Sequence, residues 1–242
     1  MIIQPKQRPI VSAGLVGSNV LWRYLDAAKF FHLLHTRTLY LHRGDLFQDK
    51  FEGSFTASLR AQIEKAIAEH DLDITYDAFR KFIRENVFVN CWRKGTHDSM
   101  AMWSLYGGAQ PSVAITTTVA NLSNSLQLPM DGLVYIQKVT YTNHWRDPTL
   151  AIDPYSNVFA YKVKAYTYEQ EVRILLDRAT GKIERPAPKP GVSMPVDLPV
   201  LLRSIVLSPG APEWFAELVR DMVQKSGLST PVRRSRLEGM PI

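Results

Sequence analysis

The segment Tyr168-Glu169-Gln170-Glu171-Val172-Arg173-Ile174-Leu175-Leu176 carries the pattern that decides the fold class. It is rich in β-branched and apolar residues and predicts a strand over 168–176. Comparable strand patterns lie at 113–118, 133–141 and 204–207, with few helical patterns between them. Because a parallel sheet needs a crossover helix between successive strands, this order favours a mixed, mostly antiparallel sheet with flanking helices to one side. We therefore expect a single α+β domain over residues 1–242.

The first half of the chain adds further strands and helices to this sheet. Strand patterns at 21–24 and 38–42 flank a helical pattern for which Asp26 is a suitable N-cap. Residues 56–86 carry two amphipathic patterns and are predicted to form a helical insertion. The remaining predicted elements are a strand at 87–92, a short helix at 99–106, a proline-rich loop at 178–199 that holds no central strand, and a last helix from Pro212 to Gly227.

The composition excludes several classes of protein. Of the 242 residues, 45% are hydrophobic and 21% are charged, so neither disorder nor a coiled coil is the main state. The single cysteine, Cys91, excludes an internal disulfide. The net charge of +6 permits binding to nucleic acid without indicating it. No run approaches the roughly 18 apolar residues that span a bilayer, so we expect a cytoplasmic protein that does not bind membranes.

The acidic residues of the strand at 168–176 are the strongest candidates for chemistry. Side chains alternate along a strand, so Glu169, Glu171 and Arg173 are expected on one face. Such charges are costly in a core unless they pair or face a cleft. Two interpretations stay open: an exposed Glu–Arg pair of little energetic value, or a cleft carboxylate oriented by an arginine.

Aromatic residues and a second arginine add candidates for ligand contact. Trp103 and Tyr106 belong to the short helix, where they either pack in the core or form a wall for a flat ring. Arg23 lies between two aromatic residues and is either a surface residue or a group that holds a phosphate. The loop at 45–53 leaves Asp49 and Glu52 near solvent or near a site.

The usual catalytic signatures are missing from the sequence. It has no Walker-type glycine loop, no GxGxxG after a strand, no GxSxG and no HExxH. The 6 histidines show no convincing ligand spacing, so no metal is expected. Cys91 has apolar strand neighbours, which favour an inert thiol over a nucleophile activated by His97.

The order of the motifs resembles that of a bacterial family catalogued only as a domain of unknown function. The pattern of that family is an N-D-x-F-E-like loop, an M-W-x-x-Y helix and a late Y-E-x-E-x-R strand. The corresponding residues here are 48–52, 102–106 and 168–173, with Gln48 in place of the usual Asn. The likeness extends over about residues 20–207, and it implies no particular activity.

A second resemblance, to ADP-ribosyltransferases, implies a chemistry. Those enzymes carry an arginine on the first strand, a small polar residue on a middle strand and a Glu-x-Glu on a late strand. Arg23, Asn90 and the pair Glu169/Glu171 are similar in type and order. At the middle position the chain departs from the pattern, because Asn90 stands where a Ser-Thr-Ser run is expected. The resemblance implies NAD as a co-substrate.

The same resemblance implies a role for each candidate. Glu171 would stabilise the oxocarbenium-like state formed when the nicotinamide–ribose bond of NAD breaks, and Glu169 would activate the acceptor. Arg23 would hold the pyrophosphate, and an aromatic ring would stack on the nicotinamide. The expected NAD contacts are Arg23, Tyr40, Asn90, Trp103, Tyr106 and Arg173.

Two functions other than NAD chemistry stay open. One is a nucleic-acid-directed nuclease or defence effector, with phosphate contacts from the basic tail (Arg233, Arg234 and Arg236) and a magnesium ion held by Asp49 and the two glutamates. The other is a non-enzymatic interaction module, in which the acidic and aromatic clusters are structural. The expected partners are thus a nucleotide-type small molecule or a nucleic acid.

Overall fold

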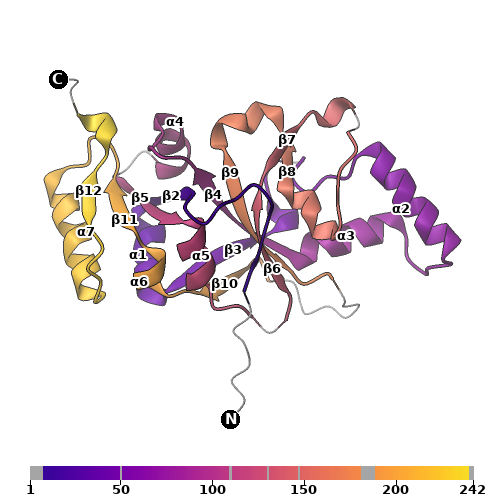
Figure 1. Ribbon diagram of the computed structural model, residues 1–242, viewed down its shortest axis with the longest axis horizontal. Helices are drawn as coiled ribbons and strands as arrows, with labels where there is room; N and C mark the ends of the chain where they lie inside the picture. Colours follow the sequence, from indigo (N-terminus) through magenta and orange to yellow (C-terminus); the bar gives the residue numbers. More distant parts are fainter. Residues whose placement is uncertain are drawn as a thin grey trace, which may run out of the picture.

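The fold is built on one long mixed sheet (Figure 1). The computed structural model describes residues 8–49, 51–108, 111–129, 131–146, 148–180 and 189–239. Within these ranges the sheet has ten strands, and its main path runs β1-β6-β9-β4-β2-β5-β11-β12. The strand bounds are β1 Ile10–Val11, β2 Val20–Asp26, β3 Thr38–Arg43, β4 Val87–Lys94, β5 Ser112–Thr118, β6 Leu133–Lys138, β9 Glu171–Asp177, β10 Gly191–Pro195, β11 Ser204–Leu207 and β12 Val232–Arg234.

The pairing of these strands is mostly antiparallel. Among the described strands of this sheet, only β1 with β6 and β11 with β12 pair in parallel. A helix, α7 (Glu213–Lys225), connects β11 to β12, as a parallel pair requires. The predicted α+β domain with a mixed, mostly antiparallel sheet is confirmed.

Helices cover both faces of the sheet. On the first face, α1 (Ala27–Thr36), α5 (Val119–Ser125), α6 (Leu198–Leu201) and α7 contribute to the main core. On the second face, α3 (Tyr76–Asn86) packs through Ile83. The expectation of helices to one side was wrong because the central strands are apolar on both faces. The adjacent residues Ile174 and Leu175 of β9, for example, belong to two different clusters.

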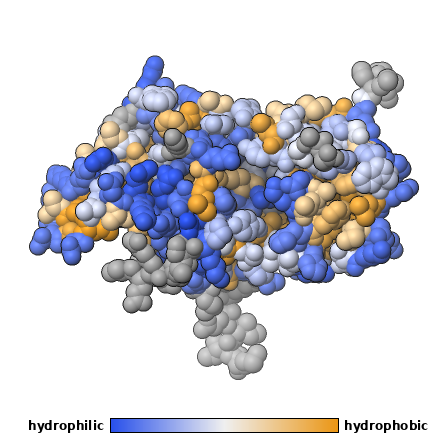
Figure 2. Space-filling model, turned by 180° about the vertical axis from the view of Figure 1, so that it is seen from behind, coloured by the Kyte–Doolittle hydropathy of each residue, from blue (hydrophilic) through white to orange (hydrophobic). Residues whose placement is uncertain are grey.

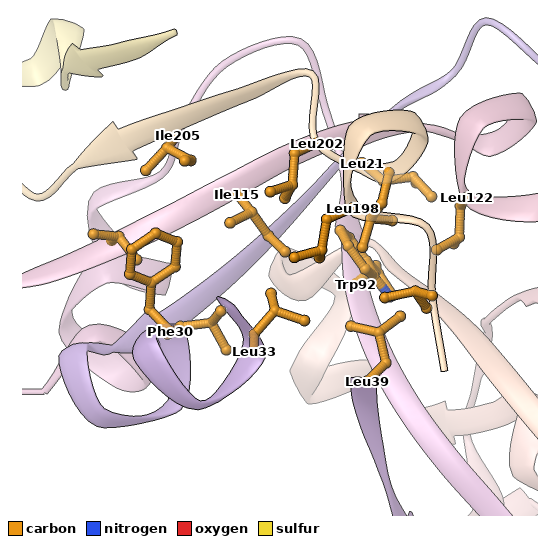
Figure 3. Close-up of a cluster of buried hydrophobic side chains, with 14 of the residues drawn as sticks. Leu21, Phe30, Leu33, Leu39, Trp92, Ile115, Leu122, Leu198, Leu202 and Ile205 are labelled. Atoms are coloured by element: carbon orange, nitrogen blue, oxygen red, sulfur yellow. The ribbon is translucent and has the colours of Figure 1, made fainter. Parts of the chain in front are cut away.

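The main core lies between α1 and the middle of the sheet (Figure 3). Phe30 and Leu33 project from α1 toward Ile115 and Ile205 on neighbouring strands. The helix begins where the sequence predicts, because the Asp26 side chain accepts a hydrogen bond from the backbone N–H of Lys29 at 2.8 Å.

The two helices predicted within residues 56–86 are present and lie at one end of the long axis (Figure 1). α2 (Ala57–Glu69) buries Leu59 and Ile63 against Leu150 in a small cluster of its own. α3 joins this end to the sheet, because Ile83 packs with Val87 at the start of β4.

Three segments differ from the sequence expectation. β9 begins at Glu171 rather than 168, because Lys164–Glu169 forms a 3-10 turn and Gln170 has a φ of +47°. The strand expected over 133–141 is divided into β6 and β7 (Thr140–Thr142), and β7 pairs with β8 (Tyr161–Val163). In the proline-rich loop, 181–188 lie outside the described residues, and β10 is an edge strand that pairs with β3.

A fork in the sheet positions the candidate site. β4 pairs with β3 at its start, through Val89, and with β2 only near its end, through Arg93 and Lys94. Between these points β2 and β3 diverge. Two side chains bridge the gap: the guanidinium of Arg23 donates to the backbone carbonyl of Cys91 at 2.6 Å, and the amide of Asn90 donates to that of Tyr40 at 2.8 Å. These bonds satisfy carbonyls that lack a neighbouring strand.

The surface gives no indication of a membrane span. No helix in the described part of the chain is both long and apolar enough to cross a bilayer. Seen from behind, hydrophobic residues gather toward the two ends of the long axis, and hydrophilic residues cover most of the surface between them (Figure 2).

Candidate functional site

A cavity of about 710 Å³ occupies the fork between β2 and β3. Its size falls within the range of about 300–1,000 Å³ that is usual for small-molecule sites. Its wall contains residues from distant parts of the sequence, because β2, β3, β4 and the segment before β9 all border the fork. The predicted site residues that line it are Arg23, Tyr40, Asn90, Tyr106, Glu169 and Glu171.

One wall of the cavity belongs to a cluster of five buried charged side chains, which we call the acidic cluster. Four of its members line the cavity (Glu52, Lys162, Glu169 and Glu171), and the fifth, Arg173, does not. The ammonium of Lys162 lies 2.5 Å from Glu169 Oε2, 2.6 Å from Glu171 Oε1 and 3.2 Å from Glu52 Oε1. The guanidinium of Arg173 donates to Glu171 Oε2 at 2.7 Å and binds both oxygens of Glu52 at 2.6 and 2.9 Å. Each buried charge is thus paired, as burial demands.

The acidic cluster holds three carboxylates and two cations, so one carboxylate lacks a full counter-charge. Burial raises the pKa of Glu169 to about 7, and its hydrogen bond with Glu171 acts in the same direction. Burial acts likewise on Glu171, but the charge of Arg173 and the hydrogen bond from Glu169 hold the pKa of Glu171 well below its usual range. Two neighbouring carboxyl groups therefore have opposite protonation behaviour near neutral pH.

Lys162 and Tyr106 fix the orientation of Glu169. Burial lowers the pKa of Lys162, but Glu171 and Glu52 raise it above the ordinary value, so the ammonium stays charged. The hydroxyl of Tyr106 donates to Glu169 Oε1 at 2.8 Å, and burial with the nearby Glu169 raises the Tyr106 pKa. Both oxygens of Glu169 therefore have a donor, and Tyr106 remains a neutral phenol.

The opposite wall of the cavity has hydrogen-bonding capacity to spare. Within the described residues Arg23 has no carboxylate partner, and only one of its nitrogens bonds to the backbone. Burial lowers its pKa, yet a guanidinium stays charged. Asn90 is 2% exposed, and its Oδ1 has no partner among the described residues. This wall therefore offers the cation of Arg23 to a ligand, whereas the Asn90 Oδ1 is enclosed by the protein.

Tyr40 lies at the mouth of the cavity, on β3. It is 43% exposed, so one side of its ring is open to a ligand. The ring is held close to Gly191 of β10, where an added Cβ would lie 2.2 Å from it. A glycine at that point gives Tyr40 the room to lie across the neighbouring strand.

Two of the predicted contacts lie outside the cavity. Trp103 is 4% exposed and packs edge-on against Tyr24, with 4.8 Å between ring centroids. Its indole belongs to a buried cluster that also contains Trp22, Tyr24 and Met102. Arg173 is fully buried behind Glu171 and donates a further bond to the Phe159 carbonyl at 2.7 Å. Neither residue is in the cavity wall.

Two residues of the acidic cluster are not among the sequence-predicted site residues. Glu52 lies in the loop expected near a site, and its proximity to the Y-E-x-E-x-R segment could not be read from spacing. Lys162 lies on the three-residue strand β8, which has no clear sequence pattern. The sequence feature that could have indicated a buried charge here is a lysine between Tyr161 and Val163, directly after an apolar turn.

Neither a cysteine nucleophile nor a bridging metal fits the arrangement of these side chains. Burial raises the pKa of Cys91, so its thiol stays protonated. The Lys162 ammonium takes the position between Glu169 and Glu171 that a magnesium ion would need, and Asp49 binds the backbone N–H of Phe51 instead. Among the described residues, no three His, Cys, Asp or Glu side chains form a metal-ligand set.

No family model, no curated protein and no solved structure matches the chain. The function is therefore argued from the geometry of the cavity and the chemistry of its walls.

Proposed function

We propose that the protein transfers ADP-ribose from NAD to an acceptor, in the manner of an ADP-ribosyltransferase. The observation that carries this proposal is the pair of carboxyl groups with opposed pKa values, Glu169 and Glu171, in one cavity with the unpaired guanidinium of Arg23. A phosphate-binding cation opposite an acid–base pair suits a substrate that carries a pyrophosphate and a scissile glycosidic bond.

Glu171 is the electrostatic group of the proposed reaction. When the nicotinamide–ribose bond breaks, its electron pair stays on nicotinamide, and positive charge develops on the ribose. A fixed carboxylate beside that charge lowers the barrier. Both oxygens of Glu171 already accept hydrogen bonds, from Lys162 and Arg173, so its role is to stabilise charge and not to form a covalent bond.

Glu169 is the general base of the proposed reaction. A pKa of about 7 suits a group that must accept a proton near neutral pH. As the acceptor oxygen bonds to the ribose carbon, its proton passes to Glu169. The Tyr106 hydroxyl and Lys162 hold the carboxylate in place for that transfer.

The remaining cavity residues would bind the two ends of NAD. Arg23 would pair with the pyrophosphate through its free nitrogens. The exposed faces of Tyr40 and Tyr106 would stack on the nicotinamide cation. Asn90 would act as a positioning residue, because its amide holds the Tyr40 backbone carbonyl beside the cavity.

The test is release of nicotinamide from NAD, measured on the wild type with water, protein and nucleic-acid acceptors. We expect turnover, with a loss of about 100- to 1,000-fold in Glu171→Gln. Glu64→Gln is the matched control, because Glu64 is an exposed carboxylate paired with Arg60 on α2, away from the cavity. Absence of turnover with every acceptor would reject the proposal. A folded but destabilised Glu171→Gln, with no activity to lose in the wild type, would instead support a non-enzymatic module.

A further inference from the structure

A second cavity, of about 480 Å³, is lined by residues from the start of β2, from β11 and β12 and from the loop after β4. We call it the arginine cavity, because its wall contains Arg203, Arg233 and Arg236. Arg233 and Arg236 come from the basic tail of the sequence, and Arg203 precedes β11. The three side chains thus line the same cavity from two segments of the chain.

In the part of the chain that the structure describes, these three arginines have no acidic partner. Within the described residues none of them makes an ion pair. The wall does contain one carboxylate, Asp98, but its Oδ2 already accepts hydrogen bonds from Ser235 at 2.5 Å and from the Trp103 indole at 3.3 Å. The cavity therefore has an excess of positive charge.

Arg234 shows what a structural arginine looks like on the same strand. Its side chain points to the other face of β12, where it binds Glu213 at 2.6 Å, Glu238 at 3.0 Å and the Ala211 carbonyl at 2.8 Å. Arg233, one residue earlier, makes a single hydrogen bond within the described residues, a long one to the Ser204 hydroxyl at 3.4 Å. Arg234 is thus fully paired, whereas Arg233 has N–H groups that can bind a ligand.

The guanidinium of Arg233 is nevertheless held in a defined place. It lies over the ring of Trp22, 5.7 Å from its centroid, which is a favourable cation–π arrangement. Trp22 is itself fixed, since it is 3% exposed and its indole donates to the Gly95 carbonyl at 2.8 Å. The two terminal nitrogens of Arg233 have no hydrogen-bond partner within the described residues. A guanidinium fixed on an aromatic ring in this way is suited to bind an oxyanion bidentately.

We propose that the arginine cavity binds phosphate groups through Arg233, Arg236 and Arg203. The ligand is either a free phosphate or nucleotide or the backbone of a nucleic acid, because both present the same oxyanion to a guanidinium. Trp22 lines both this cavity and the one in the fork. The two cavities are also connected by a hydrogen bond from Arg93, which lines the fork cavity, to the backbone carbonyl of His97, which lines the arginine cavity. A phosphate-bearing molecule bound here lies next to the fork. The inference holds whether or not the fork binds NAD.

The experiment measures binding of inorganic phosphate, ADP and a short single-stranded oligonucleotide by calorimetry, at several salt concentrations. The test variant is Arg233→Ala/Arg236→Ala, and the control is Arg234→Ala/Arg220→Ala, which removes the same charge from outside the cavity. Melting curves establish that each variant folds. We expect the test variant to bind at least about tenfold more weakly than the control, with a salt slope lower by about 1 for each phosphate group that the removed arginines would neutralise.

The three probes separate the sources of the phosphate. Binding of phosphate or ADP that the test variant loses assigns a small ligand, and binding of the oligonucleotide alone assigns a nucleic-acid backbone. The proposal is overturned if none of the probes binds at low salt, or if test and control variants bind them equally.

Discussion

The two sides of the cavity in the fork differ in how completely their arginine side chains are paired. On the β9 side, Arg173 is fully buried and bound to two carboxylates and a carbonyl. On the β2 side, Arg23 donates one bond to a backbone carbonyl and has no carboxylate partner within the described chain. Arg173 therefore stabilises the fold, whereas Arg23 has N–H groups that remain available to bind a ligand.

The comparison predicts its largest effect in stability, at Arg173. Arg173→Leu leaves Glu52 and Glu171 buried without their guanidinium, which is expected to cost about 3–5 kcal/mol. Urea unfolding measures this, with Arg220→Leu on the surface of α7 as a control that stays near the wild-type value. A loss for Arg173→Leu as small as that of the control would show that the acidic cluster is not held together as described.

Arg23 is expected to matter much less for folding. Arg23→Met keeps the apolar stem and removes one hydrogen bond to the Cys91 carbonyl, a loss of about 1 kcal/mol. The same urea experiment applies. A cost that equals the cost of Arg173→Leu would mean that Arg23 is a structural residue, and the distinction between the two walls would disappear.

The acidic cluster also predicts a pH dependence of stability. The folded-state pKa of Glu169, about 7, lies above its ordinary value of 4.5, so the folded state prefers the protonated form. The stability gained from this preference is complete below about pH 4.5 and is lost as the pH rises through 7. Unfolding free energies of the wild type should therefore fall relative to those of Glu169→Gln across that window. Parallel curves for the two proteins would contradict the assignment.

The smallest expected effect is at Tyr106. Its hydroxyl donates to Glu169, and a donor to a carboxylate favours the ionised form. Tyr106→Phe should therefore raise the pKa of Glu169 and move the acidic limb of the nicotinamide-release profile, where the rate rises with pH, to higher pH, with only a few-fold loss at the plateau. Tyr166→Phe, which alters another ring in the cavity wall, is the control. A profile that shifts equally in both variants would remove Tyr106 from this role.

The sequence predicts the sheet well because its strands have clear local patterns. β2, β4, β5 and β11 all lie where apolar and β-branched runs indicate strands. It also predicts that Glu171 and Arg173 share a face, since strand alternation is local. It does not predict that Glu169 reaches them from a 3-10 turn, after which Gln170 has a positive φ, because that bend depends on contacts with β8.

The missing parts of the site come from distant segments. Glu52 and Arg173 are 121 positions apart, and no spacing rule connects them. The fork arises because β4 changes its partner from β3 to β2 along its length. The residues of β2 and β3 do not indicate where on β4 each of them pairs. The position of Trp103 outside the fork cavity has a related reason, because its ring packs against Tyr24, a residue 79 positions away in the sequence.

The central claim is that the two walls of the fork hold one ligand between them, and calorimetric titration of NAD tests it most directly. Glu171→Gln is the protein to titrate, because it should bind NAD without consuming it. With Arg233→Ala/Arg236→Ala also present to remove the arginine cavity, we predict one site per chain, with affinity at least about tenfold weaker when Arg23→Met is added and unchanged when the added change is Arg220→Met. Absence of binding, or equal affinity with and without Arg23, would contradict the account.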